Sequence, residues 1–146
     1  MNEGVWTWRD GVFTDPLGTV AATLRSDIIR VGDCQLLTEI HRDARVLRLK
    51  ATASDGQIFI AEQAGFSLTK LAANCAGRRY RLERTRRFRR ERVILDAAGR
   101  VVARTRPHQD ALEVFDHLDD ANVPDVDVVF LTWACVEADN SGRVRI

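Results

Sequence analysis

The sequence lacks most of the features that mark a membrane-spanning or secreted protein. Its most apolar stretch, Val128 to Val136, is much shorter than the roughly 20 residues that a helix needs to cross a bilayer. Its three cysteines, Cys34, Cys75 and Cys135, are far apart and form no Cys-x-x-Cys pair, which is typical of a reducing compartment. No signal peptide or lipidation motif is recognisable. These absences predict a cytoplasmic protein without a transmembrane segment.

Motifs that would indicate catalysis or metal binding are also missing. There is no glycine-rich phosphate loop and no Gly-x-Ser-x-Gly elbow, and no base is tied by sequence to Cys75 or Ser67. The three histidines stand far apart. The aspartates between 116 and 127 lack the central glycine and closing glutamate of an EF-hand. We therefore predict a protein that is not an enzyme and has no metal site and no cofactor.

What the chain does contain indicates one soluble globular domain spanning residues 1–146. Its 146 residues are 45% hydrophobic and 29% charged, and the net charge of +1 predicts no partner. The two signs are nevertheless separated along the chain. Residues 78–106 are strongly basic, whereas residues 109–140 carry nine acids and no lysine or arginine. The oligomeric state cannot be predicted from these features.

Short alternating segments and regularly spaced turns predict a mainly β fold. Asp-Gly or Gly-Asp pairs at residues 10–11, 32–33 and 55–56 separate short segments rich in β-branched and apolar residues, as in β-hairpins. Asp96 to Gly99 separates another such pair. Residues 110–118 fit a strand or a helical turn, and we predict a strand. Residues 141–146 are predicted to be a last strand or a loose tail. This pattern favours an antiparallel meander, a sandwich or a barrel.

One element differs from the rest: the segment from Pro124 to Asp139. Thr132 is the only polar side chain between Val128 and Val136, so a helix formed from this run would be apolar on every side and would need to be buried. Asn122, Pro124 and Asp125 are interpreted as a cap, an early-turn proline and a first-turn acid. A buried strand is the alternative. We predict a helix over about 124–138, enclosed by an antiparallel meander that closes into a barrel-like sheet.

This order of elements resembles the tubby C-terminal-like superfamily, which includes the LURP-one-related proteins and the phospholipid scramblases. The resemblance covers about Arg45 to Asp139. Its hairpins are formed by residues 79–82, 89–95, 96–99 and 101–104, and the run Val128 to Val136 is similar to the helix that threads the barrel in those proteins. It implies a barrel around a helix and a function at phospholipids. The cysteine cluster of the scramblases is absent, and the phosphoinositide-binding residues of tubby proteins cannot be matched to positions here.

The strongest charge feature is a set of nine arginines within residues 78–92. Guanidinium groups bind phosphate bidentately, so we predict a polyanion site formed by Arg79, Arg81, Arg84, Arg86, Arg87, Arg89 and Arg90 on an outer strand face. An anionic phospholipid surface, such as the inner face of the membrane, is the favoured ligand. This makes the protein a non-catalytic binding or scaffold module.

Two other interpretations of the arginines stay open. The first is a nucleic-acid-binding module in which Tyr80 and Phe88 stack on bases, although the near-neutral total charge counts against it. The second is a solvated face on which the arginines pair with Glu83, Glu91 and the acids of residues 110–127.

Overall fold

The computed structural model describes residues 4–43, 46–86 and 89–140 as twelve strands and one helix. The strands are β1 Trp6–Arg9, β2 Val12–Thr14, β3 Val20–Arg25, β4 Ile28–Val31, β5 Cys34–Arg42, β6 Leu47–Ala53, β7 Ile58–Gln63, β8 Lys70–Cys75, β9 Arg78–Arg84, β10 Arg92–Asp96, β11 Val101–His108 and β12 Ala111–Phe115. The helix is α1, Asp125–Asp139. The predicted tail or strand at 141–146 lies outside the described residues.

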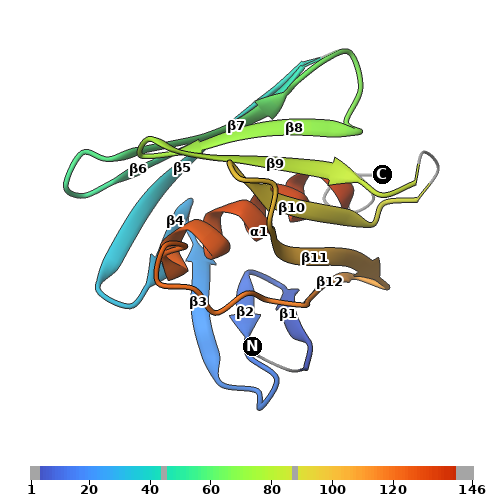
Figure 1. Cartoon of the computed structure of the whole chain (residues 1–146). Coiled ribbons are helices and arrows are strands. Elements are labelled where there is room, and N and C mark those ends of the chain that lie inside the picture. Colours follow the sequence, from blue (N-terminus) through green and yellow to red (C-terminus); the bar gives the residue numbers. More distant parts are fainter. Residues whose placement is uncertain (1–3, 44–45, 87–88, 141–146) are drawn as a thin grey trace.

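The strands form a closed antiparallel barrel in which each strand pairs with its neighbours in the chain. Closure comes from β1, which pairs with β12 in the register Thr7 opposite Glu113. Closure leaves no unpaired sheet edge. The predicted meander and its closure are confirmed, and α1 passes through the interior (Figure 1). Strands β3 and β8 are additions, because neither stood out in the sequence as a separate strand.

Alternation along the strands decides which side chains face the helix. In β6, Leu47, Leu49, Ala51 and Ala53 are buried, as expected for a strand with one face inside. Several interior positions of β6 to β8 are small, and they leave room for the helix to approach the barrel wall. These positions are Ala51, Ala53, Ala61, Ala73 and Cys75.

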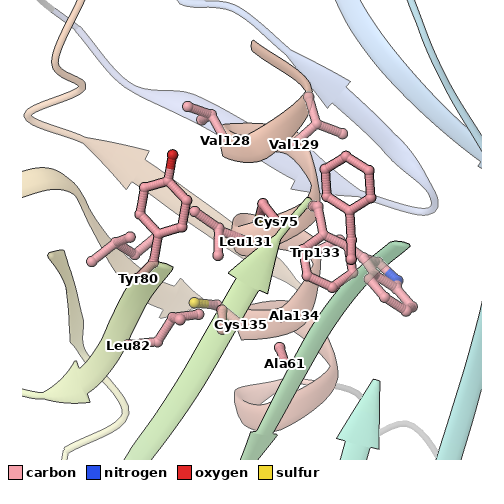
Figure 2. Close-up of a cluster of buried hydrophobic side chains, with 14 of the residues drawn as sticks. Ala61, Cys75, Tyr80, Leu82, Val128, Val129, Leu131, Trp133, Ala134 and Cys135 are labelled. Carbon is pink, nitrogen blue, oxygen red and sulfur yellow. The ribbon is translucent and has the colours of Figure 1, made fainter. Parts of the chain in front are cut away.

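The apolar run of the sequence is the buried part of α1. Leu131 and Cys135 point toward Tyr80 and Leu82 of β9 (Figure 2). On another face, the ring of Phe130 lies 5.8 Å from that of Trp133 and 5.6 Å from that of Phe59, centroid to centroid. The predicted filling of the barrel by Phe130 and Trp133 is confirmed, since both are buried.

Two hydrogen-bonding details of the helix depart from, or complete, the prediction. The N-cap residue is Pro124, which makes no side-chain capping bond, so the interpretation of Asn122 as the cap is wrong. Inside the barrel, the Trp8 indole N–H donates to Thr132 Oγ1 at 2.8 Å, and this hydroxyl donates to the carbonyl of Val128 at 2.7 Å. The one polar side chain of the apolar run is therefore satisfied within the core.

Tight turns join most strands, and the first of them requires glycine. Asp10 and Gly11 have φ angles of 51° and 76°, which matches the predicted hairpin turn. A Cβ atom on Gly11 would lie 2.7 Å from the carbonyl oxygen of Leu24, while the Leu24 N–H donates to Gly11 O at 2.7 Å. This turn packs so closely on β3 that only glycine fits.

Candidate functional site

Strand β9 presents arginines on both of its faces. Tyr80 and Leu82 are buried, and Arg79 and Arg81 are exposed, as the alternation of the sequence predicts. Arg84 follows Tyr80 and Leu82 on the inward-facing side of β9, and its side chain pairs with Asp139 of the helix at 3.1 Å. Its expected position on the outer face is therefore wrong.

The first turn of the helix is anchored to the beginning of β9. Arg78 donates to Asp127 from Nε to Oδ2 at 2.7 Å and from Nη2 to Oδ1 at 2.9 Å, and the Tyr80 hydroxyl donates to Oδ2 at 2.6 Å. Burial, together with this bond to Asp127, raises the pKa of Tyr80, and the bond to Asp127 raises that of Arg78. The buried Asp127 carboxylate thus has three donors from one strand.

The last turn of the helix is anchored at the other end of the barrel. Arg92 is fully buried and donates to Asp139 from Nε at 2.6 Å and from Nη2 at 3.0 Å. Its remaining donors reach the carbonyls of Leu82 and Leu68 at 3.2 and 2.5 Å. Arg92, which is not among the arginines predicted for the outer face, therefore points inward and shares Asp139 with Arg84.

Cations from the β9–β10 connection and from β5 also reach the backbone at this end of the helix. Arg90 Nη1 donates to the carbonyl of Asp139 at 2.9 Å, and Arg42 Nη2 donates to that of Glu137 at 3.2 Å. The helix has no basic residue in its own last turn, where positive charge is favourable. The barrel supplies that charge.

The distance between the two anchoring carboxylates along the helix matches the distance between their arginines along β9. Asp127 and Asp139 are twelve residues apart in the helix, about 18 Å at ~1.5 Å per residue. Arg78 and Arg84 are six residues apart in the strand, about 20 Å at ~3.3 Å per residue. One strand therefore spans both acidic ends of α1, and the interior is occupied by a fixed helix rather than by an open lumen.

The predicted polyanion site is divided by this arrangement. Arg84 and Arg90 bind the end of the helix. Arg79 and Arg81 stay on the outer face of β9, and Arg86 and Arg89 are exposed in the connection to β10. Arg87 lies outside the described residues, as does Phe88.

Acids accompany many of the outer cations. Arg81 lies 3.4 Å from Glu83, and Arg89 lies 4.0 Å from Glu91. The acidic segment contributes further pairs, in which Arg100 meets Asp120, Arg104 meets Asp116 and Arg106 meets Glu113. The predicted pairing with Glu83 and Glu91 is confirmed for Arg81 and Arg89, whereas these acids of residues 110–127 pair with arginines that follow the basic segment 78–92. Within the described residues, Arg79 and Arg86 have no ion-pair partner.

An exposed aromatic residue lies in the connection that adjoins the basic one. Phe66, in the β7–β8 connection, is 97% exposed. This connection adjoins the β9–β10 connection, because the Arg84 N–H donates to Thr69 O at 2.8 Å and Arg92 reaches Leu68 O. Both connections leave the barrel at the end where α1 finishes (Figure 1). We call Phe66, Arg86 and Arg89 the loop end.

Two cavities lie between α1 and the strands. One, of about 290 Å³, is bordered by Trp133 and Asn140 near the end of the helix, and we call it the Trp133 cavity. The other, of about 370 Å³, is bordered by Trp6, Phe13 and His117 near the beginning of the helix. Burial lowers the pKa of His117, against the opposing effect of Asp125 and Asp119.

The described residues contain no group of three or more histidine, cysteine, aspartate or glutamate side chains placed to hold a metal ion.

Burial raises the pKa of Cys135 to about 12 and also raises that of Cys75, so neither is a ready nucleophile. In the part of the chain that the structure describes, no helix is both long enough and apolar enough to traverse a membrane.

Comparison with known proteins identifies no relative: no family model, no curated protein and no solved structure matches the chain.

Proposed function

We propose that the protein is a non-catalytic binding module that docks on anionic phospholipid through its loop end. One observation carries this proposal: an almost fully exposed phenylalanine, Phe66, and the exposed Arg86 and Arg89 lie in two connections that adjoin at their bases, at one end of the barrel. An aromatic side chain that enters the lipid interface gains from burial. Each neighbouring cation adds about 1 kcal/mol at an anionic surface. Arg79 and Arg81, on the adjoining outer face, extend the cationic area.

The interior arrangement supports docking over uptake of lipid into the barrel. The helix fills the centre and is anchored at both ends by Arg78, Arg84 and Arg92. A lipid chain would have to displace a helix that is apolar all round and held by buried ion pairs. A surface role leaves these contacts intact.

Kinship with the tubby C-terminal-like superfamily is part of the same proposal. It rests on the paired hairpins and on the late apolar helix inside a closed barrel. The same reading implies a cytoplasmic protein that associates peripherally with the inner face of the membrane.

The rival nucleic-acid interpretation loses one of its supports. It required Tyr80 to stack on bases, but Tyr80 is buried and donates its hydroxyl to Asp127. The remaining exposed cations are spread over a strand and a loop, and several are paired with acids. We therefore treat binding of nucleic acid as an outcome of the test.

Vesicle co-sedimentation across a salt series tests the proposal. The protein should sediment with vesicles that contain phosphatidylserine and not with phosphatidylcholine alone, and added salt should release it. Arg86→Gln and Arg89→Gln should each weaken binding about fivefold, at about 1 kcal/mol per charge. Phe66→Ser should weaken it about tenfold or more.

Leu17→Ser is the matched control, because Leu17 is 92% exposed in the β2–β3 connection, which leaves the other end of the barrel. Equal effects of Phe66→Ser and Leu17→Ser would contradict the proposal. So would salt-sensitive binding of a single-stranded oligonucleotide without vesicle binding.

A further inference from the structure

The free space inside the barrel lies mainly on one side of the helix. Small interior residues of β6 and β7, namely Ala51, Ala53 and Ala61, let α1 lie close to that wall, and its nearest strands are β4, β6, β7, β11 and β12. Both cavities are bordered by β1 and β3. The stacked rings of Trp8 and Phe13, 5.1 Å apart, lie at their boundary, because Trp8 borders the Trp133 cavity and Phe13 borders the other one. The cavities are thus the space that the helix leaves by packing closest to the other strands.

The cavity at the beginning of the helix, which we call the Trp6 cavity, has apolar walls that solvent can reach. Its volume is about 370 Å³, within the range of small-molecule pockets. Four of its apolar side chains are only partly buried: Trp6, Ala21, Val31 and Val126. Its other apolar side chains are buried: Phe13, Val128 and Val129. A ligand in this cavity would remove from water apolar surface that the free protein leaves accessible.

Three aromatic rings hold one another in place at the Trp6 cavity. The indole of Trp6 lies 5.4 Å from the ring of Phe13, centroid to centroid, with 29° between their planes. The imidazole of His117 lies 5.4 Å from the same indole, at 71°. All three residues border the cavity. Aromatic walls suit a compact apolar body, and they favour a cationic group over an anionic one, since the faces of the rings carry partial negative charge.

The only residue of the lining that is charged at neutral pH is an acid, Asp125. This residue is exposed, no lysine or arginine borders the cavity, and within the described residues Asp125 has no ion-pair partner. Its carboxylate and that of Asp119 act on the His117 imidazole, but burial outweighs them and lowers the pKa of His117. The imidazole is therefore neutral at neutral pH. The cavity carries a negative charge that the protein does not neutralise.

The positive end of a helix normally favours an anion, but α1 begins without an open anion site. The N–H groups of Asp127 and Val128 donate to the carbonyl of Pro124 at 3.0 and 3.3 Å. Asp125 lies in the same first turn, where its negative charge complements the helix dipole. An anionic ligand would be repelled by Asp125 without gaining these two amide bonds.

We propose that the Trp6 cavity binds a small organic cation, an amine with a compact apolar body. The apolar body lies against Trp6, Val31 and Val126, and the ammonium group lies beside the Asp125 carboxylate. The site is at the beginning of α1, whereas the loop end is where α1 finishes. Binding of the amine therefore does not depend on any membrane contact.

Three probes of similar shape separate the charge of the ligand from its apolar body. 2-Phenylethylammonium, 2-phenylethanol and phenylacetate share a benzene ring and a short chain, and they carry a positive, a neutral and a negative group. Titration of the full-length protein is followed by the Trp6 indole N–H resonance in ¹H–¹⁵N spectra, which Trp6→Phe identifies. The amine should bind about two- to fivefold more tightly than the alcohol, the range for one exposed ion pair. Phenylacetate should bind more weakly than the alcohol, and added salt should reduce both differences.

Asp125→Asn tests the charge without changing the shape of the cavity. It should lower the affinity for the amine to that for the alcohol, and it should leave the affinity for the alcohol unchanged. Glu39→Gln is the matched control, because the Glu39 side chain is 62% exposed on β5 and does not border the cavity. This variant should change neither affinity.

Ala21→Leu tests the location of the site. The larger side chain enters the cavity from β3 and should weaken binding of the amine and of the alcohol more than tenfold, while the other amide resonances show that the fold is kept. Val20→Leu is the control on the same strand, because Val20 is 56% exposed and does not border the cavity. If Ala21→Leu does not fold, Asp125→Asn still decides the outcome.

The proposal would be overturned by the absence of saturable binding of the amine, by equal affinities for the amine and the alcohol, or by tighter binding of phenylacetate. Unchanged binding of the amine in Asp125→Asn, or in a folded Ala21→Leu variant, would overturn it as well.

Discussion

Arg78 and Asp127 are 49 residues apart in the sequence and share two hydrogen bonds, of 2.7 and 2.9 Å. The Asp127 side chain has no exposed surface, whereas 36% of the Arg78 side chain is exposed. The pair joins the first turn of the helix to the wall of the barrel. Its two members differ in access to water, so removing one is not equivalent to removing the other.

Arg78→Met should lower the free energy of unfolding by about 3 to 5 kcal/mol, because it leaves the buried Asp127 carboxylate with one neutral donor. Asp127→Asn should cost less, about 1 to 2 kcal/mol, since Arg78 can rehydrate and the amide still accepts from Tyr80. Urea unfolding measures both. Arg81→Met, on the outer face, should stay within about 1 kcal/mol of the wild type. Equal costs at Arg78 and Asp127 would show that the carboxylate is not isolated from water.

Arg92→Lys tests whether the fork geometry or only the charge holds the end of the helix. Lysine keeps the charge but cannot make two parallel bonds to Asp139 and still reach Leu82 O and Leu68 O. We expect a loss of about 2 to 4 kcal/mol in the free energy of unfolding. Arg84→Lys is the matched change on the same carboxylate, and it should cost under about 1 kcal/mol because Arg84 makes a single bond to Asp139. Similar costs at both positions would contradict this explanation.

Phe130→Ala should lower the free energy of unfolding by about 3 to 5 kcal/mol, because Phe130 is fully buried between Phe59 and Trp133 and its loss leaves a cavity. Phe66→Ala, at the exposed loop end, should change it by less than about 0.5 kcal/mol. Thermal and urea unfolding both report the difference. A small effect of Phe130→Ala would mean that the helix is packed loosely in the barrel.

Stability should decrease in mild acid through His117. Burial lowers the pKa of this imidazole in the folded state, so the unfolded state binds the proton more readily. The contribution of the neutral His117 imidazole to the free energy of unfolding is complete above the pKa of about 6.5 that it has in the unfolded state. This contribution is lost as the pH falls through the lower pKa of the folded state. His117→Gln should reduce the slope of unfolding free energy against pH in this range. An unchanged slope, or an NMR titration of His117 above the unfolded value, would refute the prediction.

Thiol reactivity should separate the three cysteines. Cys75 and Cys135 are buried, with raised pKa values, whereas Cys34 is half-buried at the start of β5. A thiol reagent at neutral pH should therefore modify Cys34 in the native protein and all three after denaturation. Mass spectrometry of the peptides identifies the sites. Rapid native labelling of Cys135 would show that the barrel opens.

The sequence could reveal the strands because their evidence is local. Asp10 and Gly11 require a tight turn, and the alternation of Leu47, Leu49 and Ala51 with polar residues marks a face. The run from Val128 to Val136 has no polar side that could meet water, which requires enclosure by something. Together these features predict a barrel around a helix. Strand β8 was not predicted because Ala72 and Ala73, on opposite faces, weaken the alternation between polar and apolar residues that marks a strand.

The sequence contained weaker evidence for which arginines face the helix and which face outward. Arg78, Tyr80, Leu82 and Arg84 share one parity in β9, and this was the signal that two arginines face inward. An arginine at the end of such a stripe can equally bend out to water at the rim. Only the position of a carboxylate decides between the two, and Asp127 and Asp139 lie about 50 residues further along the chain.

The sequence by itself determined the periodicities, the turns and the need to bury one apolar helix, because these depend on neighbouring residues and on the free energy of removing apolar surface from water. The tertiary structure decided which charges are used to hold the helix and which remain for a partner. Coulomb and hydrogen-bond energies depend on distances through space, and the chain sets those distances only after the barrel has closed.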